Sequence, residues 1–203
     1  MMKGRWWTLL LPAGLVLILA AGPSPAGKPE KPAASSAADG GFVLCESPYA
    51  LCTRAMCSPV AGPDGGLDGL LSCKCSVQSG YSVGMKCQAP KETPVGKIIF
   101  SRYSPMRSYV QCNNSRPWAW CLDSPCLVDA DNPLQATATC TCRATSSPQS
   151  TYIATSDFYS AAACTTGIIS SATVQDGNSI AQFFQAATHT VVKITVLNPD
   201  AGK

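Results

Sequence analysis

Charged side chains are scarce in this sequence of 203 residues. They make up 13% of the chain, about half of the roughly 25% that an average globular protein carries. The formal net charge is +3, too small for the strong basic field that nucleic-acid binding requires. The composition therefore excludes nucleic acid as a partner, and it also excludes a coiled coil, a collagen-like chain and an acidic disordered tail.

Motifs that carry common catalytic chemistry are lacking as well. The sequence contains no Gly-x-Ser-x-Gly elbow, no glycine-rich phosphate loop and no zinc spacing of the CxxC type. His189 is the only histidine, and a pair of carboxylates for glycoside chemistry would have to come from Asp123, Asp129 and Asp157. We therefore predict no catalytic residue, no cofactor and no metal site. A small extracellular, hydrolase-like enzyme is kept as an alternative.

Apolar runs long enough to span a membrane are also missing. The apolar stretch 9–21 is interrupted by Pro12 and Gly14, and it is shorter than the roughly 20 residues that a membrane helix needs. Lys3 and Arg5 precede this stretch, and small residues follow it up to Ala26. This order is typical of a secretory signal peptide, so we predict cleavage after Ala26 and no stable membrane span thereafter. An uncleaved anchor is the alternative.

Cysteine, in contrast, is abundant, and all twelve cysteines follow the predicted signal. An even number of cysteines behind a signal peptide predicts a disulfide framework in a secreted or periplasmic protein. The first five cysteines of one set lie 67 or 69 residues before their counterparts in a second set, and PYALCTRAMC (48–57) matches PWAWCLDSPC (117–126). The sequence therefore predicts a duplication. We divide the chain into a signal peptide (1–26), a flexible linker (27–41), repeat 1 (42–88), a connector (89–111), repeat 2 (112–164) and a C-terminal extension (165–203).

Each repeat contains the pattern of a β-hairpin between its third and fourth cysteines. Turn residues fill 61–69 and 129–133, and threonines alternate along 136–142. In each Cys-x-Cys pair the two sulfurs point to one face of a strand, at a separation that disfavours a bond between them. In the extension, Asn178 is expected to cap a short helix, and 190–197 is expected to form a strand. The predicted fold is small, disulfide-rich and mainly β, with two tandem hairpin-based modules and a C-terminal helix and strand.

The cysteine spacing of repeat 1, C-x6-C-x4-C-x15-C-x-C-x11-C, resembles that of the EGF-like module. Gly80, Tyr81 and Gly84 resemble the glycine and aromatic positions of that module's last loop. Repeat 2 matches less well, because its last interval is longer and lacks these positions. The resemblance implies that the first cysteine bonds the third, the second the fourth and the fifth the sixth: Cys45–Cys57, Cys52–Cys73, Cys75–Cys87, Cys112–Cys126, Cys121–Cys140 and Cys142–Cys164.

Two metal alternatives remain open at this stage. The Cys-x-Cys pairs, together with Met56, Met85 and His189, offer ligands for a soft metal such as Cu(I). Acidic and amide side chains in the two hairpin loops offer oxygens for calcium, although the same residue types are common in turns without a metal: Asp64, Asp68, Asp129, Asp131 and Asn132.

Two clusters of aromatic and cationic residues are the candidates for a binding surface, because such residues are enriched at binding hot spots. Trp120 stands where repeat 1 has Leu51, which suggests that the two copies are used unequally. We predict a binding or interaction protein whose partner is an unknown protein or glycan. A purely structural role of the tryptophans in core packing is the alternative, and it stays open at this point. A disulfide-rich enzyme inhibitor that presents 58–70 is a further alternative. The candidate binding residues are Arg102, Tyr103, Arg107, Tyr109, Arg116, Trp118 and Trp120.

Overall fold

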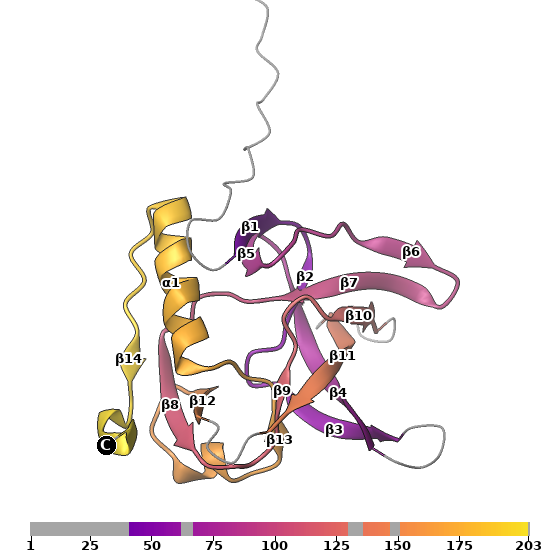
Figure 1. The fold of residues 1–203 in the computed structure, drawn as a ribbon. Coiled ribbons are helices and arrows are strands. Elements are labelled where there is room, and N and C mark those ends of the chain that lie inside the picture. Colours follow the sequence, from indigo (N-terminus) through magenta and orange to yellow (C-terminus); the bar gives the residue numbers. More distant parts are fainter. Residues whose placement is uncertain (1–40, 62–66, 130–135, 147–150, 203) are drawn as a thin grey trace, which may run out of the picture. The chain divides into compact units, whose positions relative to one another are not determined.

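The computed structural model describes residues 41–61, 67–129, 136–146 and 151–202 (Figure 1). The predicted signal peptide and, apart from Gly41, the predicted linker lie outside the described residues. Strands dominate the described part of the chain, which contains one α-helix. The prediction of a mainly β, disulfide-rich fold is therefore confirmed. Within the described ranges, none of the helices has the length and apolarity needed to cross a membrane.

The two repeats form five strands each, in the same order. Repeat 1 forms β1 (Val43–Glu46), β2 (Tyr49–Leu51), β3 (Met56–Ala61), β4 (Leu67–Gln78) and β5 (Tyr81–Gly84), and is followed by β6 (Lys91–Thr93) and β7 (Gly96–Arg102). Repeat 2 forms β8 (Ser108–Asn113), β9 (Trp118–Trp120), β10 (Pro125–Val128), β11 (Thr137–Thr145) and β12 (Thr151–Thr155). The 3₁₀ turn η1 (Ala161–Cys164), β13 (Ile168–Ile169), the helix α1 (Val174–Thr188), β14 (Thr195–Val196) and the 3₁₀ turn η2 (Pro199–Gly202) complete the chain.

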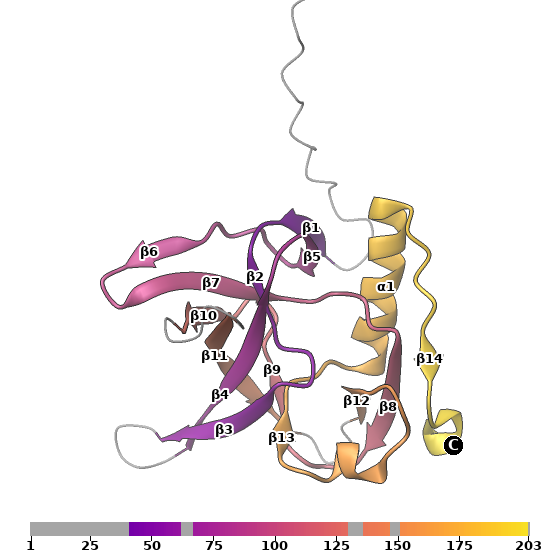
Figure 2. The same ribbon diagram turned by 180° about the vertical axis from the view of Figure 1, so that it is seen from behind.

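Five strands from both repeats close into a ring. β2 pairs with β4, β4 with β11, β11 with β10 and β10 with β7, and all four pairings are antiparallel. β7 returns to β2 in a parallel pairing and so completes a closed barrel (Figures 1 and 2). A closed ring leaves no unpaired edge among its own strands.

The strand pairings of the two repeats are equivalent and interlocked. β1 pairs with β5 as β8 pairs with β12, and β2 pairs with β4 as β9 pairs with β11. A strand that lies beyond the last cysteine of each repeat pairs with the third strand of the other repeat, β7 with β10 and β13 with β3. The finer prediction of two tandem modules is not confirmed, because both repeats share one sheet.

All twelve cysteines are bonded, and each bond stays within one repeat. The pairing is nested, first with sixth, second with fifth and third with fourth: Cys45–Cys87, Cys52–Cys75, Cys57–Cys73, Cys112–Cys164, Cys121–Cys142 and Cys126–Cys140. The pairing that the EGF-like resemblance implied is therefore wrong. The hairpins explain the difference, because β3–β4 and β10–β11 place the third and fourth cysteines directly opposite each other.

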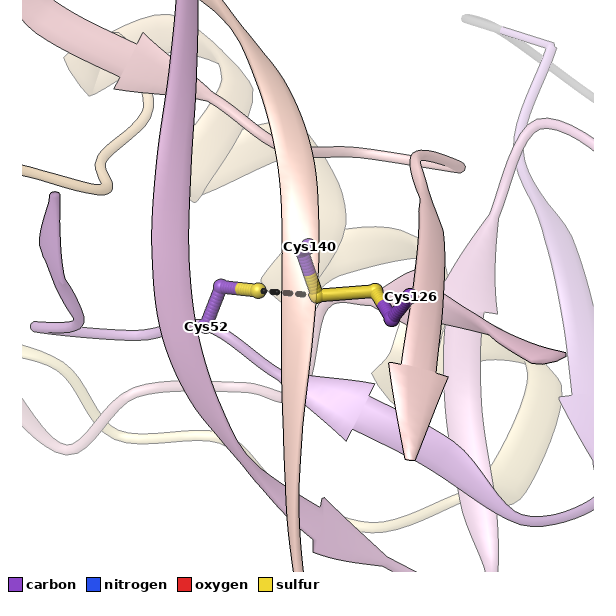
Figure 3. A group of neighbouring side chains, drawn as sticks. All are labelled: Cys52, Cys126 and Cys140. Carbon is purple, nitrogen blue, oxygen red and sulfur yellow. Dashed lines mark hydrogen bonds between the residues drawn. A yellow bond between two sulfur atoms is a disulfide. The ribbon is translucent and has the colours of Figure 1, made fainter. Parts of the chain in front are cut away.

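Cysteine side chains make up much of the main core cluster. Cys57, Cys73, Cys140 and Cys126 lie in one row across the adjacent strands β3, β4, β11 and β10. The Sγ atom of Cys52, from a separate disulfide, lies 3.4 Å from that of Cys140 (Figure 3). These cysteines are buried and pack with small apolar residues in one core cluster.

The helix α1 begins earlier than the sequence pattern predicts. Thr173, not Asn178, is the N-cap, because its side chain accepts a hydrogen bond from the Asp176 amide and the Asp176 carboxylate accepts one from the Thr173 amide. Ile180 is buried and Phe183, Phe184 and Ala187 are partly buried, as the spacing of these apolar residues predicts. The predicted strand 190–197 is reduced to β14, which pairs in parallel with β8.

Candidate functional site

The seven predicted binding residues do not form one surface. Arg102, Tyr109 and Trp118 are buried, whereas Arg107 and Arg116 are exposed. Tyr103 and Trp120 are partly buried and lie together. Each predicted cluster therefore contains both buried and exposed residues. Between the two clusters, the partly buried Tyr103 and Trp120 lie together.

Arg102 is a structural residue, so its assignment as a binding residue is wrong. It is 2% exposed, and its Nη1 atom lies 2.7 Å from Oδ1 of Asp123. The same Nη1 donates to the carbonyl of Ser101, while Nε is buried without a partner among the described residues. β5 passes over this ion pair at Gly84, where a Cβ atom would lie 2.7 Å from the Asp123 carboxylate. This buried ion pair thus joins the end of β7, in the connector, to repeat 2.

Tyr109 and Trp118 also belong to the interior, which corrects their assignment to a binding surface. Tyr109 is 3% and Trp118 is 2% exposed. Trp118 stacks on Tyr152 with ring centroids 6.0 Å apart, and both lie in one core cluster. Because aromatic rings supply much of the apolar surface in a small chain, these two fill the core next to β8 and β12.

Tyr103 and Trp120 line one cavity of about 140 Å³. A single water needs only about 10–15 Å³ of such space, so a small organic group has room to enter. The cavity lies where segments of both repeats meet the first turns of α1. Its lining residues are Phe42, Met85, Tyr103, Trp120, Leu122 and Asp176.

Tyr103 is held firmly in this cavity. Its backbone N–H and C=O bond those of Val83, at 2.9 and 2.8 Å, and its hydroxyl donates to the carbonyl of Ser171 at 3.1 Å. Burial, followed by the negative charges of Asp176 and Asp123, raises the pKa of Tyr103 above its ordinary value. The ring is therefore a neutral, fixed wall.

The other walls come from the ends of strands and from α1. Trp120 ends β9, and Leu122 follows in the tight turn after Cys121. Phe42 precedes β1 and packs against Phe183 of α1, with ring centroids 6.2 Å apart. Met85 forms an accessible rim, because it follows β5 and is 48% exposed. The cavity has rigid aromatic walls and one flexible, polarisable edge.

A smaller hollow lies at the position that the duplication makes equivalent to this cavity, with the roles of the two repeats exchanged. Ala172 pairs with Ile153 as Tyr103 pairs with Val83, and Thr53 and Thr155 stand at the positions of Leu122 and Met85. This hollow has a volume of about 30 Å³. The two copies are therefore unequal, and the larger space is the one lined by Trp120.

The candidate catalytic residues are dispersed. His189 ends α1 on the surface, beside Gln182, Gln185 and Ala186. Asp157 faces Arg54 at 3.6 Å, and Asp123 is bound to Arg102. These carboxylates thus have separate structural partners.

Asp129 and the cysteines have structural partners too. Asp129 accepts hydrogen bonds from Thr137 and Thr139 and faces Lys74 at 3.4 Å. The bond from Thr137, then that from Thr139, lowers the pKa of Asp129. Asp64, Asp131 and Asn132 lie outside the described residues, as do residues 62–66 of the 58–70 segment and the side chain of Asp68. The cysteines that cluster around Cys52 are in disulfides, so they offer no thiolate.

Comparisons with protein-family models, with curated proteins and with solved structures return no match to this chain.

The sequence analysis did not place four of the cavity residues in a binding site for an organic ligand: Phe42, Met85, Leu122 and Asp176. Asp176 had a local signal, since Thr173-x-x-Asp176 is a capping box that places a carboxylate in the first turn of a helix. The other three converge only through β1–β5 pairing and the turn after β9. Sequence spacing alone carries no information on that convergence.

Proposed function

We propose that this protein is a non-enzymatic binding protein, secreted or periplasmic, and that the cavity beside Trp120 receives a small apolar group of its ligand. The observation that carries the proposal is that two half-buried aromatic side chains, Tyr103 from the connector and Trp120 from repeat 2, line one cavity although they are distant in the sequence. Binding sites are concave and mostly apolar, with a few polar groups that set orientation. This cavity has that composition.

The scaffold supports the same reading. Six disulfides are typical of proteins in oxidising compartments. Strand pairing and the disulfides fix the walls of the cavity before any ligand arrives, and preorganisation of this kind reduces the entropic cost of binding. The dispersed titratable groups favour binding over catalysis, because an enzyme needs such groups to converge in one pocket.

Neutral fragments test the proposal directly. We expect 3,3-dimethylbutan-1-ol, titrated into the oxidised protein, to shift the NMR signals of the Trp120 indole and the Tyr103 ring in a saturable manner. Trp120→Leu gives repeat 2 the residue that repeat 1 has at the equivalent position, Leu51. This substitution should weaken fragment binding by about tenfold or more, since a hot-spot aromatic contributes about 2 kcal/mol.

The matched control is Phe158→Ala, which removes an aromatic side chain that is exposed and does not line the cavity. Its fragment affinity should equal that of the original protein. The proposal fails at this cavity if no fragment shifts these signals, or if Trp120→Leu binds as well as Phe158→Ala. Thermal melting of both variants shows whether the fold is retained.

A further inference from the structure

Asp176 is the only charged residue among the six that line the cavity. Its Oδ2 atom accepts hydrogen bonds from the hydroxyl and the amide of Thr173. Among the described residues, Oδ1 has no hydrogen-bond partner and the carboxylate has no ion pair. A negative charge with one uncommitted oxygen therefore borders a largely apolar space.

The helix end does not turn this cavity into an anion site. The Asp176 amide donates to the Thr173 hydroxyl, and the Gly177 amide donates to the Thr173 carbonyl. The capping box thus occupies the Asp176 N–H, and the Gly177 N–H makes the first hydrogen bond of the helix, so neither is free for an anion. The carboxylate also offsets the positive end of the helix dipole, and it is the charged group that lines the cavity.

The aromatic walls favour a cation of a particular kind. Phe42, Tyr103 and Trp120 are three of the six lining residues, and the faces of aromatic rings attract ammonium groups, with tryptophan the strongest. A primary ammonium or a metal ion would lose its water shell to apolar walls. An ammonium that carries alkyl groups is poorly hydrated and fits both the apolar lining and the charge.

We propose that the cavity selects a small alkylated ammonium ion, with its cationic nitrogen among the three rings and facing Asp176. This inference rests on the proposed binding function and adds the charge of the ligand to it. Met85, the exposed rim residue, leaves an opening through which the remainder of the ligand extends to solvent.

The decisive experiment compares choline with 3,3-dimethylbutan-1-ol, in which carbon replaces the cationic nitrogen at the same size. Calorimetry on the intact oxidised protein should show that choline binds about tenfold more tightly or better. Asp176→Asn keeps a hydrogen-bonding oxygen for the cap but removes the charge, so the choline preference should largely vanish while the neutral alcohol binds as before. Asp176→Glu should retain part of the preference.

Asp157→Asn is the matched control, since it removes a highly exposed carboxylate outside the cavity and should leave the preference unchanged. Equal affinity for choline and the alcohol overturns the inference and leaves the binding function intact. Failure of both probes to bind overturns both. Choline and phosphatidylcholine vesicles, used as separate probes, distinguish a free ligand from a lipid head group, and capture of either at the Trp120 cavity supports the proposal.

Discussion

The buried ion pair between Arg102 and Asp123 has an unusual setting in a chain with so few charges. Burial lowers the pKa of Arg102, and the negative charge of Asp123 opposes that shift. Asp123 also accepts a hydrogen bond from the amide of Met85, so one carboxylate fixes both the arginine and the rim of the cavity. Arg102, which the sequence analysis predicted to contact a ligand, therefore helps to hold Asp123 and the rim of the cavity in place.

The Arg102–Asp123 pair gives a prediction at the residue scale. Arg102→Met leaves Asp123, with a side chain only 11% exposed, as a buried charge without its partner. Loss of one partner of a buried pair destabilises a protein by about 3–5 kcal/mol, and chemical denaturation should show a decrease of that size.

The double variant Arg102→Met/Asp123→Asn is the control. It removes both charges, and Asn tolerates the positive φ of 59° at this position. Much of the lost stability should therefore return. If Arg102→Met alone unfolds at the original denaturant concentration, the pair does not stabilise the fold as described.

The helix α1 shows what local sequence reveals about an element and what it does not. The spacing of Ile180, Phe183 and Phe184 predicts the buried face correctly, because helical periodicity is a local property. The start at Thr173 was missed, since Val174 to Gly177 carry little apolar pattern. Gly177, a poor helix former, is present because α1 packs closely on β12: a Cβ atom there would lie 2.9 Å from Cδ1 of Ile153.

At the scale of this element, we predict opposite effects of one substitution in two backgrounds. Gly177→Ala should destabilise the original protein, because the clash with Ile153 outweighs the gain of about 1 kcal/mol in helix propensity. Ile153→Val removes the Cδ1 atom, so Gly177→Ala should be stabilising in that background. A double-mutant cycle by thermal denaturation measures this coupling, and additive effects would show that the close approach is not rigid.

At the scale of the whole molecule, the sequence predicted the duplication but not the interlocking of the two copies. Cysteine spacing and recurring residues such as Tyr49 and Trp118 are visible along the chain. The pairings of β7 with β10 and of β3 with β13 join distant segments, so no local pattern contains them. The disulfide pairing was wrong for the same reason, because it follows from strand order and the spacing was compatible with several connectivities.

The nested disulfides predict an order of reduction. Cys87 is exposed and Cys164 is partly exposed, whereas the eight cysteines of the four inner bonds are buried. Thiolate attack requires access to a sulfur atom, so limited reduction should open Cys45–Cys87 and Cys112–Cys164 first. Alkylation and mass mapping of the trapped species check this order. An inner bond that opens first would contradict it.

The exchange of strands between equivalent halves resembles the interface of a two-fold homodimer, in which each subunit lends the same element to the other. A single half would leave β3 or β10 without the strand that now covers it, and two identical halves could supply one another. Joining them in one polypeptide removes the requirement that both copies be identical. Leu51 and Trp120 use that freedom: Trp120 lines the cavity of about 140 Å³, whereas Leu51, at the equivalent position, does not line the other hollow, and identical subunits of a homodimer could not differ in this way.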